Sequence, residues 1–254
     1  MKNKIVVANW KMKLSLKESI KLAIKAKTKF KNFKSREIVI CPPMIVLDEI
    51  AKIFKNTNIK VGAQDVFWEE SGAFTGETSP TMLVEAGCEY VIIGHSERRK
   101  YLLLNYEMIH KTVKEVLNIK GLTPIVCIGE ESDDRKTDKR DFVLVDQLQQ
   151  ALGGINIMKE QLIIVAYEPI WAIGSGIAIE PSEAEYAHKI IKLTLNDMFG
   201  MKTVSNNFQI IYGGSISSKN VSNFKKIENI DGLLVGSSSL DINEFYKIAK
   251  VILK

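Results

Sequence analysis

The chain contains few cysteines, prolines and histidines: three, six and three among 254 residues. An odd number of widely spaced cysteines, Cys41, Cys88 and Cys127, argues against a disulfide framework. Two of them lie at or near the ends of apolar runs that are typical of strands. We therefore expect reduced, buried thiols and a reducing compartment.

Long apolar runs are also missing. Near the amino terminus the only apolar stretch is residues 5–8, which is too brief for a signal peptide and far too short to span a membrane. The composition, 46% hydrophobic and 26% charged, is ordinary for a soluble globular protein. We expect a cytoplasmic protein with no membrane partner.

The formal net charge of +5 comes largely from one run of lysines. No aromatic residues interleave with them as in a nucleic-acid-binding surface, and no helix-turn-helix or zinc-binding pattern accompanies them. The run therefore predicts a solvated helix face and no nucleic-acid partner. Its members are Lys17, Lys21, Lys25, Lys27, Lys29, Lys31 and Lys34.

Short runs rich in Val and Ile recur along the whole chain. Segments of helical periodicity separate them, and each apolar stripe predicts one buried helix face. One stripe consists of Leu16, Ile20, Ala23 and Ile24, and another of Ile109, Val113, Val116 and Leu117. The eight runs are residues 5–8, 38–41, 59–63, 90–93, 123–128, 162–166, 209–212 and 232–235.

Apolar strands that alternate with amphipathic helices are typical of parallel strands buried on both faces. The runs recur about every 32 residues, the size of one βαβ step. Eight such units predict an α/β fold, a closed (β/α)8 barrel that forms a single domain over residues 1–254, because an open doubly wound sheet usually has fewer strands. In such barrels the chemistry lies on the loops that follow the strands.

Three of these loops carry side chains suited to proton transfer. Lys11 follows the first strand and suits a phosphate, although it could equally be an ordinary surface lysine. His95 follows the fourth strand, at the start of a predicted helical turn, where a neutral imidazole could polarise a carbonyl. Glu168 follows the sixth strand and could act as a base under a closing apolar loop, or form a structural ion pair. His110 and His188 lie inside predicted helices, and we expect no role for them.

Two glycine-containing turns, residues 212–215 and 235–239, follow the seventh and eighth strands, where barrels of this kind bind phosphate. Glycines let backbone amides approach an anion closely. Either turn alone could be a simple tight turn, but the two together favour phosphate binding. The sequence thus predicts an isomerase that moves a proton between two carbons of a small phosphorylated sugar.

The same segments resemble those of the triosephosphate isomerase family. The resemblance runs the full length and implies a TIM barrel that interconverts dihydroxyacetone phosphate and D-glyceraldehyde 3-phosphate in glycolysis and gluconeogenesis, without metal or organic cofactor. This family is itself a standard example of pKa tuning and loop closure. The matching motifs are NWKM from Asn9, GAQD from Gly62, ESGAFTGE from Glu70, GHSERR from Gly94, YEPIWAIGSG from Tyr167 and YGGS from Tyr212.

The resemblance also implies roles for residues of this chain. Glu168 would be the base that shuttles the proton, His95 the neutral electrophile, and Lys11 the cation that faces the substrate oxygens. Asn9 would be a polar partner beside them. Glu97 would support the site, or else pair with a nearby arginine.

By the same resemblance, Tyr212 would help to hold a closed lid, and Cys127 matches a buried cysteine near the base. Two departures from the family pattern affect this end of the site. Ser237 stands where a second glycine is usual, so the phosphate contacts differ, and the lid ends in residues 177–179, Ile-Ala-Ile, instead of Lys-Thr-Ala. The implied phosphate-binding residues are Gly174, Ser215, Gly236 and Ser237.

The segment 64–79 predicts a long loop that carries Phe67, Trp68 and Phe74. So much apolar surface on a loop needs cover, either from its own barrel or, as we expect, from a partner subunit. In the family this loop inserts Thr75 into the neighbouring subunit's site. The resemblance therefore implies a homodimer whose isolated subunits work poorly.

Two other functions stay open. One is a related barrel isomerase that acts on a longer phosphorylated ketose, which the motifs discriminate poorly. The other is a phosphate-binding barrel without catalysis, and the retention of Lys11, His95 and Glu168 together argues against it.

Overall fold

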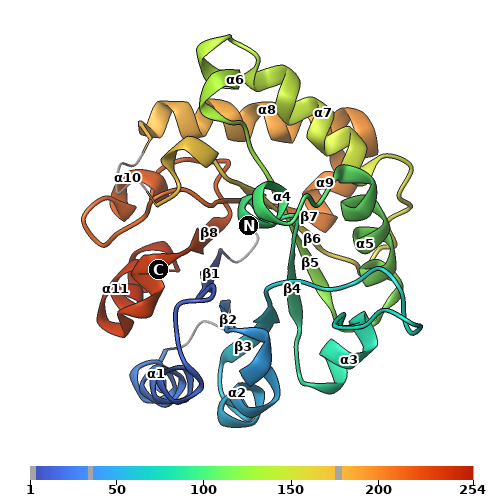
Figure 1. Ribbon diagram of the computed structural model, residues 1–254. Helices are drawn as coiled ribbons and strands as arrows, with labels where there is room; N and C mark the ends of the chain where they lie inside the picture. The colour runs from blue at the N-terminus through green and yellow to red at the C-terminus, as the bar shows by residue number, and fades with distance from the viewer. Residues whose placement is uncertain (1–3, 34–36, 175–178, 254) are drawn as a thin grey trace.

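The computed structural model describes residues 4–33, 37–174 and 179–253, and it shows a closed barrel of eight parallel strands (Figure 1). Each strand pairs with the next, and β8 pairs with β1 to close the barrel. The predicted fold class is confirmed. The strands are β1 (Ile5–Asn9), β2 (Ile38–Cys41), β3 (Ile59–Ala63), β4 (Tyr90–Ile93), β5 (Thr123–Ile128), β6 (Ile163–Tyr167), β7 (Phe208–Tyr212) and β8 (Gly232–Val235).

Helices surround the barrel on all sides (Figure 1). The α-helices are α1 (Leu16–Lys29), α2 (Leu47–Phe54), α3 (Pro80–Glu85), α4 (Ser96–Tyr101), α5 (Tyr106–Asn118), α6 (Ser132–Lys136), α7 (Arg140–Leu152), α8 (Pro181–Phe199), α9 (Met201–Asn207), α10 (Val221–Lys225) and α11 (Ile242–Ile252). Three 3-10 turns follow strands or loops: η1 (Met44–Val46), η2 (Ile170–Ala172) and η3 (Ser237–Leu240). None of the helices in the described part of the chain is long and apolar enough to cross a membrane.

The strands are buried on both faces, so the molecule has two apolar cores. In β1, Ile5 and Val7 belong to the core inside the barrel, while Val6 and Ala8 belong to the larger core between barrel and helices. This alternation follows from the two-residue period of a strand. It fixes which residues face the interior, and it leaves the strand ends to carry the polar groups.

Helix α1 buries a different face from the predicted one. Leu16 and Ile24 are about half exposed, 48% and 52%, and of the predicted stripe only Ala23 is fully buried. The face against the barrel consists mainly of small residues, which let the helix approach closely: Ser19, Leu22, Ala23 and Ala26. The predicted face of α5 is confirmed, because Ile109, Val113, Val116 and Leu117 are all buried.

The lysine run lies on α1 and just after it. Lys17, Lys21, Lys25, Lys27, Lys29 and Lys31 are all exposed, as predicted, and Lys34 lies outside the described residues. Cys41, Cys88 and Cys127 are free and buried, as expected.

Candidate active site

A cavity of about 230 Å³ opens at the carboxyl ends of the strands. Its walls come from the segments that follow β1, β4, β6, β7 and β8, so the barrel closure brings distant parts of the chain together. The predicted residues that line it are Asn9, Lys11, His95, Glu168, Gly174, Ser215, Gly236 and Ser237. Three others do not line it: Glu97 pairs with a lining residue, Tyr212 is buried in β7, and Thr75 is exposed on the loop 64–79.

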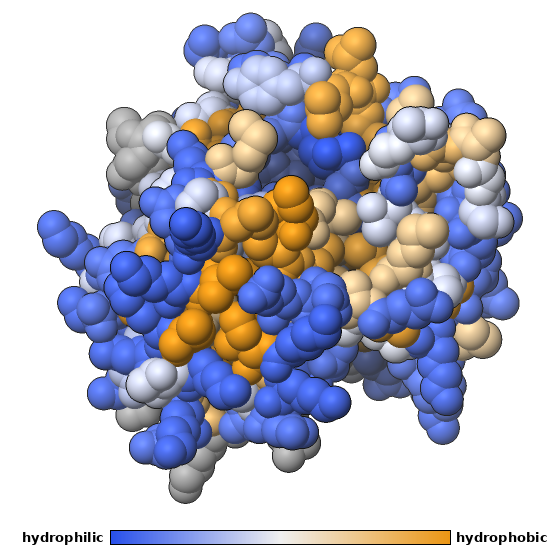
Figure 2. Space-filling model, turned by 60° about the horizontal axis from the view of Figure 1, so that its bottom comes forward, coloured by the Kyte–Doolittle hydropathy of each residue, from blue (hydrophilic) through white to orange (hydrophobic). Residues whose placement is uncertain are grey.

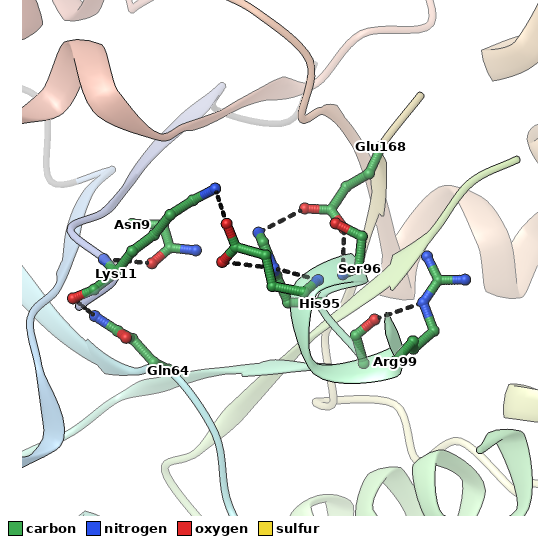
Figure 3. A network of polar contacts seen from close by, with 9 residues as sticks. Asn9, Lys11, Gln64, His95, Ser96, Arg99 and Glu168 are labelled. Atoms are coloured by element: carbon green, nitrogen blue, oxygen red, sulfur yellow. Dashed lines mark hydrogen bonds and ion pairs between the residues drawn. The ribbon is translucent and has the colours of Figure 1, made fainter. Parts of the chain in front are cut away.

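Glu168 stands at the end of β6, with only 1% of its surface exposed. Its Oε1 lies 3.1 Å from Nε2 of His95, and its Oε2 accepts a hydrogen bond of 3.0 Å from the backbone amide of Ser96 (Figure 3). The chain can come this close only because Gly129 has no side chain, since a Cβ there would lie 1.7 Å from the carbonyl oxygen of Glu168. The carboxylate is therefore held in a dry and crowded position.

The hydrogen bonds of His95 define its tautomer. His95 is the N-cap of α4, and its Nδ1 accepts a hydrogen bond of 3.2 Å from the backbone amide of Glu97. A ring nitrogen that accepts cannot carry a proton, so a neutral imidazole must carry its proton on Nε2. The Nε2 proton points to Glu168, so it can reach a carbonyl oxygen in the cavity only after Glu168 has moved away from it.

Lys11 has a strained backbone, with φ at 53°, a value that non-glycine residues rarely adopt. Two side chains hold it there: Oδ1 of Asn9 accepts from its backbone amide at 3.0 Å, and Nε2 of Gln64 donates to its carbonyl at 3.1 Å. Its Nζ lies 2.7 Å from Oε1 of Glu97. Glu97 thus pairs with a lysine of the cavity and not with an arginine, the alternative that the sequence had left open.

The two glycine-containing turns form the other end of the cavity. Ser237 opens η3, and the next two serines brace this turn: the Ser238 hydroxyl donates to the carbonyl of Ile216, and the Ser239 hydroxyl to that of Gly236, both at 2.6 Å. Ser237 itself is exposed to the cavity. Gly236, Ser237 and Ser238 all line the cavity at this end, and backbone amides and hydroxyl groups are the donors that suit an anion.

Tyr212 is fully buried and stacks on Phe224 with ring centroids 4.5 Å apart. Burial raises the pKa of Tyr212, and a weaker opposing effect comes from the backbone of Ile179, which lies at the end of the predicted lid. A Cβ on Gly214 would lie 2.0 Å from the tyrosine hydroxyl, so glycine is needed there. Ile177 and Ala178, where the lid departs from the family pattern, lie outside the described residues, and Ile179 is buried.

Cys127 lies in β5 on the inner face of the barrel. Burial raises its pKa well above the usual range, and the negative charge of nearby Glu168 raises it further. The thiol therefore stays protonated beside the carboxylate. This position agrees with the family's buried cysteine near the base.

Sequence reasoning missed two side chains that support the site. Glu130 is 1% exposed, and its Oε1 accepts from Nε1 of Trp171 at 2.9 Å and from the hydroxyl of Tyr167 at 3.1 Å. It lies two residues beyond the end of β5, so the rule that the loops after strands carry function could have found it. Gln64 belongs to the GAQD motif, but the sequence predicted no role for it. The amide of Ser96 leaves no trace in a sequence, because any residue has one.

The loop 64–79 holds its aromatic residues together. Phe67 lies 4.0 Å from Trp68 and 4.6 Å from Phe74, measured between ring centroids. Phe74 is nevertheless 43% exposed. At the base of the loop, Asp65 lies 2.5 Å from Nη2 of Arg98, and the buried Nε of Arg98 has no partner within the described part of the chain.

Comparison with known proteins agrees with this geometry. The family model described as triosephosphate isomerase matches residues 4–252. The chain belongs to the triosephosphate isomerase family. It is similar to proteins named triosephosphate isomerase from Dictyoglomus thermophilum, 41% identical over 98% of this chain and 100% of the relative, and from a Thermoanaerobacter species, 42% identical over 98% and 99%. A third such relative, from Dehalococcoides mccartyi, is 42% identical over 98% of this chain and 96% of its own length. Family membership confirms the resemblance on which the predicted residue roles were based.

Proposed function

We propose that this chain interconverts dihydroxyacetone phosphate and D-glyceraldehyde 3-phosphate by proton transfer through an enediolate. One observation carries the proposal: the buried carboxylate of Glu168 and the imidazole of His95 meet at 3.1 Å, between Oε1 and Nε2, in one cavity. An aldose–ketose isomerisation needs this pair, a base for a carbon-bound proton and a donor for the adjacent carbonyl oxygen. Membership of the family supports a phosphorylated triose as the substrate.

The geometry suggests the order of events. In this structure the Glu168 carboxylate lies against Nε2 of His95 and accepts a hydrogen bond from the backbone amide of Ser96. The substrate carbonyl must therefore displace Glu168 from His95 before it can bind there. Glu168 then takes a proton from the carbon beside the carbonyl, and His95 stabilises the oxygen that gains negative charge. Once a proton has passed from the adjacent hydroxyl group to this oxygen, Glu168 returns its proton to the former carbonyl carbon, and the neighbouring carbon is left as the new carbonyl. Lys11 offsets the charge of the enediolate and phosphate, and Glu97 keeps its ammonium group in place.

The phosphate would bind at the turns after β7 and β8. Gly174, Ser215, Gly236 and Ser237 line this end of the cavity, where their backbone amides would meet the phosphate, and a Cβ built on Gly236 would lie 3.5 Å from Cε of Lys11, so the lysine side chain passes close to this turn. Binding energy from the phosphate would hold the reacting carbons beside Glu168.

We also propose a homodimer. Figure 2 shows a patch of apolar surface on the side of the molecule that carries α1, α2 and α3, with a hydrophilic rim. Segments of this side carry exposed apolar side chains: Met12 at 95%, Ile45 at 79%, Phe74 at 43% and Met82 at 53%. A second copy would cover them, and Thr75 would reach the partner's site. An acceptor from that copy would also satisfy the buried Nε of Arg98.

The test is turnover by the purified chain without added metal. We expect conversion of dihydroxyacetone phosphate in a coupled assay, and much weaker activity on a longer ketose phosphate. Faster turnover of the longer sugar would move the assignment to that alternative, and no turnover of either would overturn the catalytic proposal.

Glu168→Asp tests the role of the base. The substitution retracts the carboxylate by one methylene, so we expect kcat to fall roughly 100-fold or more while KM changes little. Glu160→Asp, at an exposed position, is the matched control and should leave both constants unchanged. Equal kcat values for the two variants would contradict a base at position 168.

A further inference from the structure

A guanidinium group covers the indole of Trp171. The Cζ of Arg135, on α6, lies 4.3 Å from the centroid of the ring. At the edge of the same ring, Nε1 donates to the buried carboxylate of Glu130 at 2.9 Å. The indole is therefore held both on its face and at its edge, and a cation over the face of a tryptophan is a favourable contact.

Arg135 is itself fixed from its outer side. Its Nη2 lies 3.3 Å from Oε2 of Glu183, and Nη1 of Arg140 lies 2.9 Å from the same oxygen. Glu183 stands in the first turn of α8, where the helix dipole favours a carboxylate. A planar guanidinium can stack on a ring and pair with a carboxylate at once, which a lysine ammonium group cannot do equally well.

A short segment, anchored by backbone hydrogen bonds, connects the indole of Trp171 to Glu168. Trp171 follows Glu168 by three residues, within η2. The amide of Glu168 donates to the carbonyl of Ile128 at 2.7 Å, and the amide of Ile170 to that of Glu130 at 3.1 Å. A rotation of the indole would pull on this segment, and the Glu168 carboxylate has little tolerance for displacement from a reacting carbon.

We propose that Arg135 is a positioning residue for proton transfer: by stacking on Trp171 it fixes the turn that carries Glu168. The inference rests on the proposed isomerase function. A purely structural surface ion pair would act differently. Arg135 and Glu183 have side chains 44% and 34% exposed, and such pairs add little to stability. The role of Arg135 should therefore be visible in kcat more than in the melting temperature.

The first test replaces Arg135 by Met and by Lys in the full-length chain. We expect Arg135→Met to lower kcat roughly five- to tenfold with KM changed less than about twofold, since it removes positioning of the base and not substrate contacts. Arg135→Lys keeps the charge and should recover only part of kcat. Lys136→Met, on the same helix with a 70% exposed side chain, is the control and should leave kcat unchanged.

A double-mutant cycle separates positioning from a general structural effect. Trp171→Leu removes the ring, so Arg135→Met should lower kcat no further in that background, whereas Lys136→Met should have no effect in either. Melting temperatures of all variants show whether each one folds. If the effects of Arg135→Met and Trp171→Leu multiply, or if Arg135→Met retains full kcat, the inference is overturned while the proposed function stands. No turnover by the unmodified chain would overturn both.

Discussion

Two buried histidines of this chain are in very different environments. His95 receives a backbone hydrogen bond at Nδ1 and offers Nε2 to the cavity. His188, in α8, is completely buried, and its Nδ1 faces the carbonyl of Asn229 at 2.9 Å. Burial lowers the pKa of His188 to about 4. Residue type alone therefore did not separate the two, but their positions did: one follows a strand, and the other lies inside a helix.

His188 makes stability depend on pH. Its pKa in the folded state is below the unfolded value of about 6.5, so the unfolded chain binds the extra proton and stability is lost as the pH falls from about 6.5 to 4. The full effect is on the order of 3 kcal/mol. Urea unfolding at several pH values should show a smaller loss for His188→Gln, which keeps an N–H donor but does not titrate.

Asp65 changes the stability with pH in the opposite direction over part of this range. The informative quantity is therefore the difference in unfolding free energy between the unmodified protein and His188→Gln. Burial raises the pKa of Asp65 to about 6 despite the neighbouring Arg98, and its contribution to stability is lost as the pH rises through that value. Because Asp65 is present in both proteins, it cancels in the comparison. Identical pH dependence of the two proteins would contradict the assignment to His188.

The residues that line the cavity could be predicted from the sequence because each follows a strand or ends one, and a closed barrel brings all strand ends to one face. Lys11, His95 and Glu168 needed no more than that rule and the family motifs. Their contacts could not be predicted in the same way. The pairing of Lys11 with Glu97 depends on a left-handed backbone at Lys11, and the hold on Glu168 depends on a main-chain amide.

At the scale of elements, the strands were predicted to within one residue at each end, because apolar runs buried on both faces leave a strong and continuous signal. The buried face of α1 was not predicted correctly. Its buried face is made of Ser and Ala as well as Leu, so counting large apolar residues placed the face one step away from its true position. The pattern of large apolar residues identifies the helix. It does not identify the buried face of a helix whose contact is formed by small residues.

The loop between α4 and α5 contains a strained residue. Leu103 has φ at 55° and is 80% exposed, so it has a left-handed backbone with little packing in return. We expect Leu103→Gly to raise the free energy of unfolding by about 1 kcal/mol, the relief of strain exceeding the entropy that glycine adds to the unfolded chain. Urea unfolding monitored by circular dichroism measures the change.

Leu102 offers a matched control for this substitution. It is the preceding residue, the C-cap of α4, and 60% exposed, but its φ is −113°, a value that leucine adopts without strain. Leu102→Gly should therefore be neutral or destabilising. If both glycine variants shift the urea midpoint in the same direction, backbone strain at Leu103 is not the cause.

At the scale of the whole molecule, the barrel explains the cavity at its carboxyl end but not the exposed apolar surface beside it. Phe67, Trp68 and Phe74 pack together within the loop 64–79, yet Phe74 stays 43% exposed. Helix α4, whose N-cap is His95, also carries Arg98, which pairs with Asp65 at the base of this loop. A partner that covers the loop would therefore stabilise the segment next to His95, which we propose acts on the substrate carbonyl.

This coupling predicts that activity depends on association. The unmodified chain of 28.6 kDa should sediment at about twice that mass. Thr75→Arg places a charge in the expected interface, so we expect monomers whose kcat is at least roughly tenfold lower, because a desolvated unpaired charge opposes burial of the loop. Met158→Lys changes a 59% exposed side chain before β6, at the opposite end of the barrel, and should leave both mass and kcat unchanged. Sedimentation and turnover measured at the same concentrations decide the point: a fully active Thr75→Arg monomer would show that each barrel works alone, with its loop packed on its own surface.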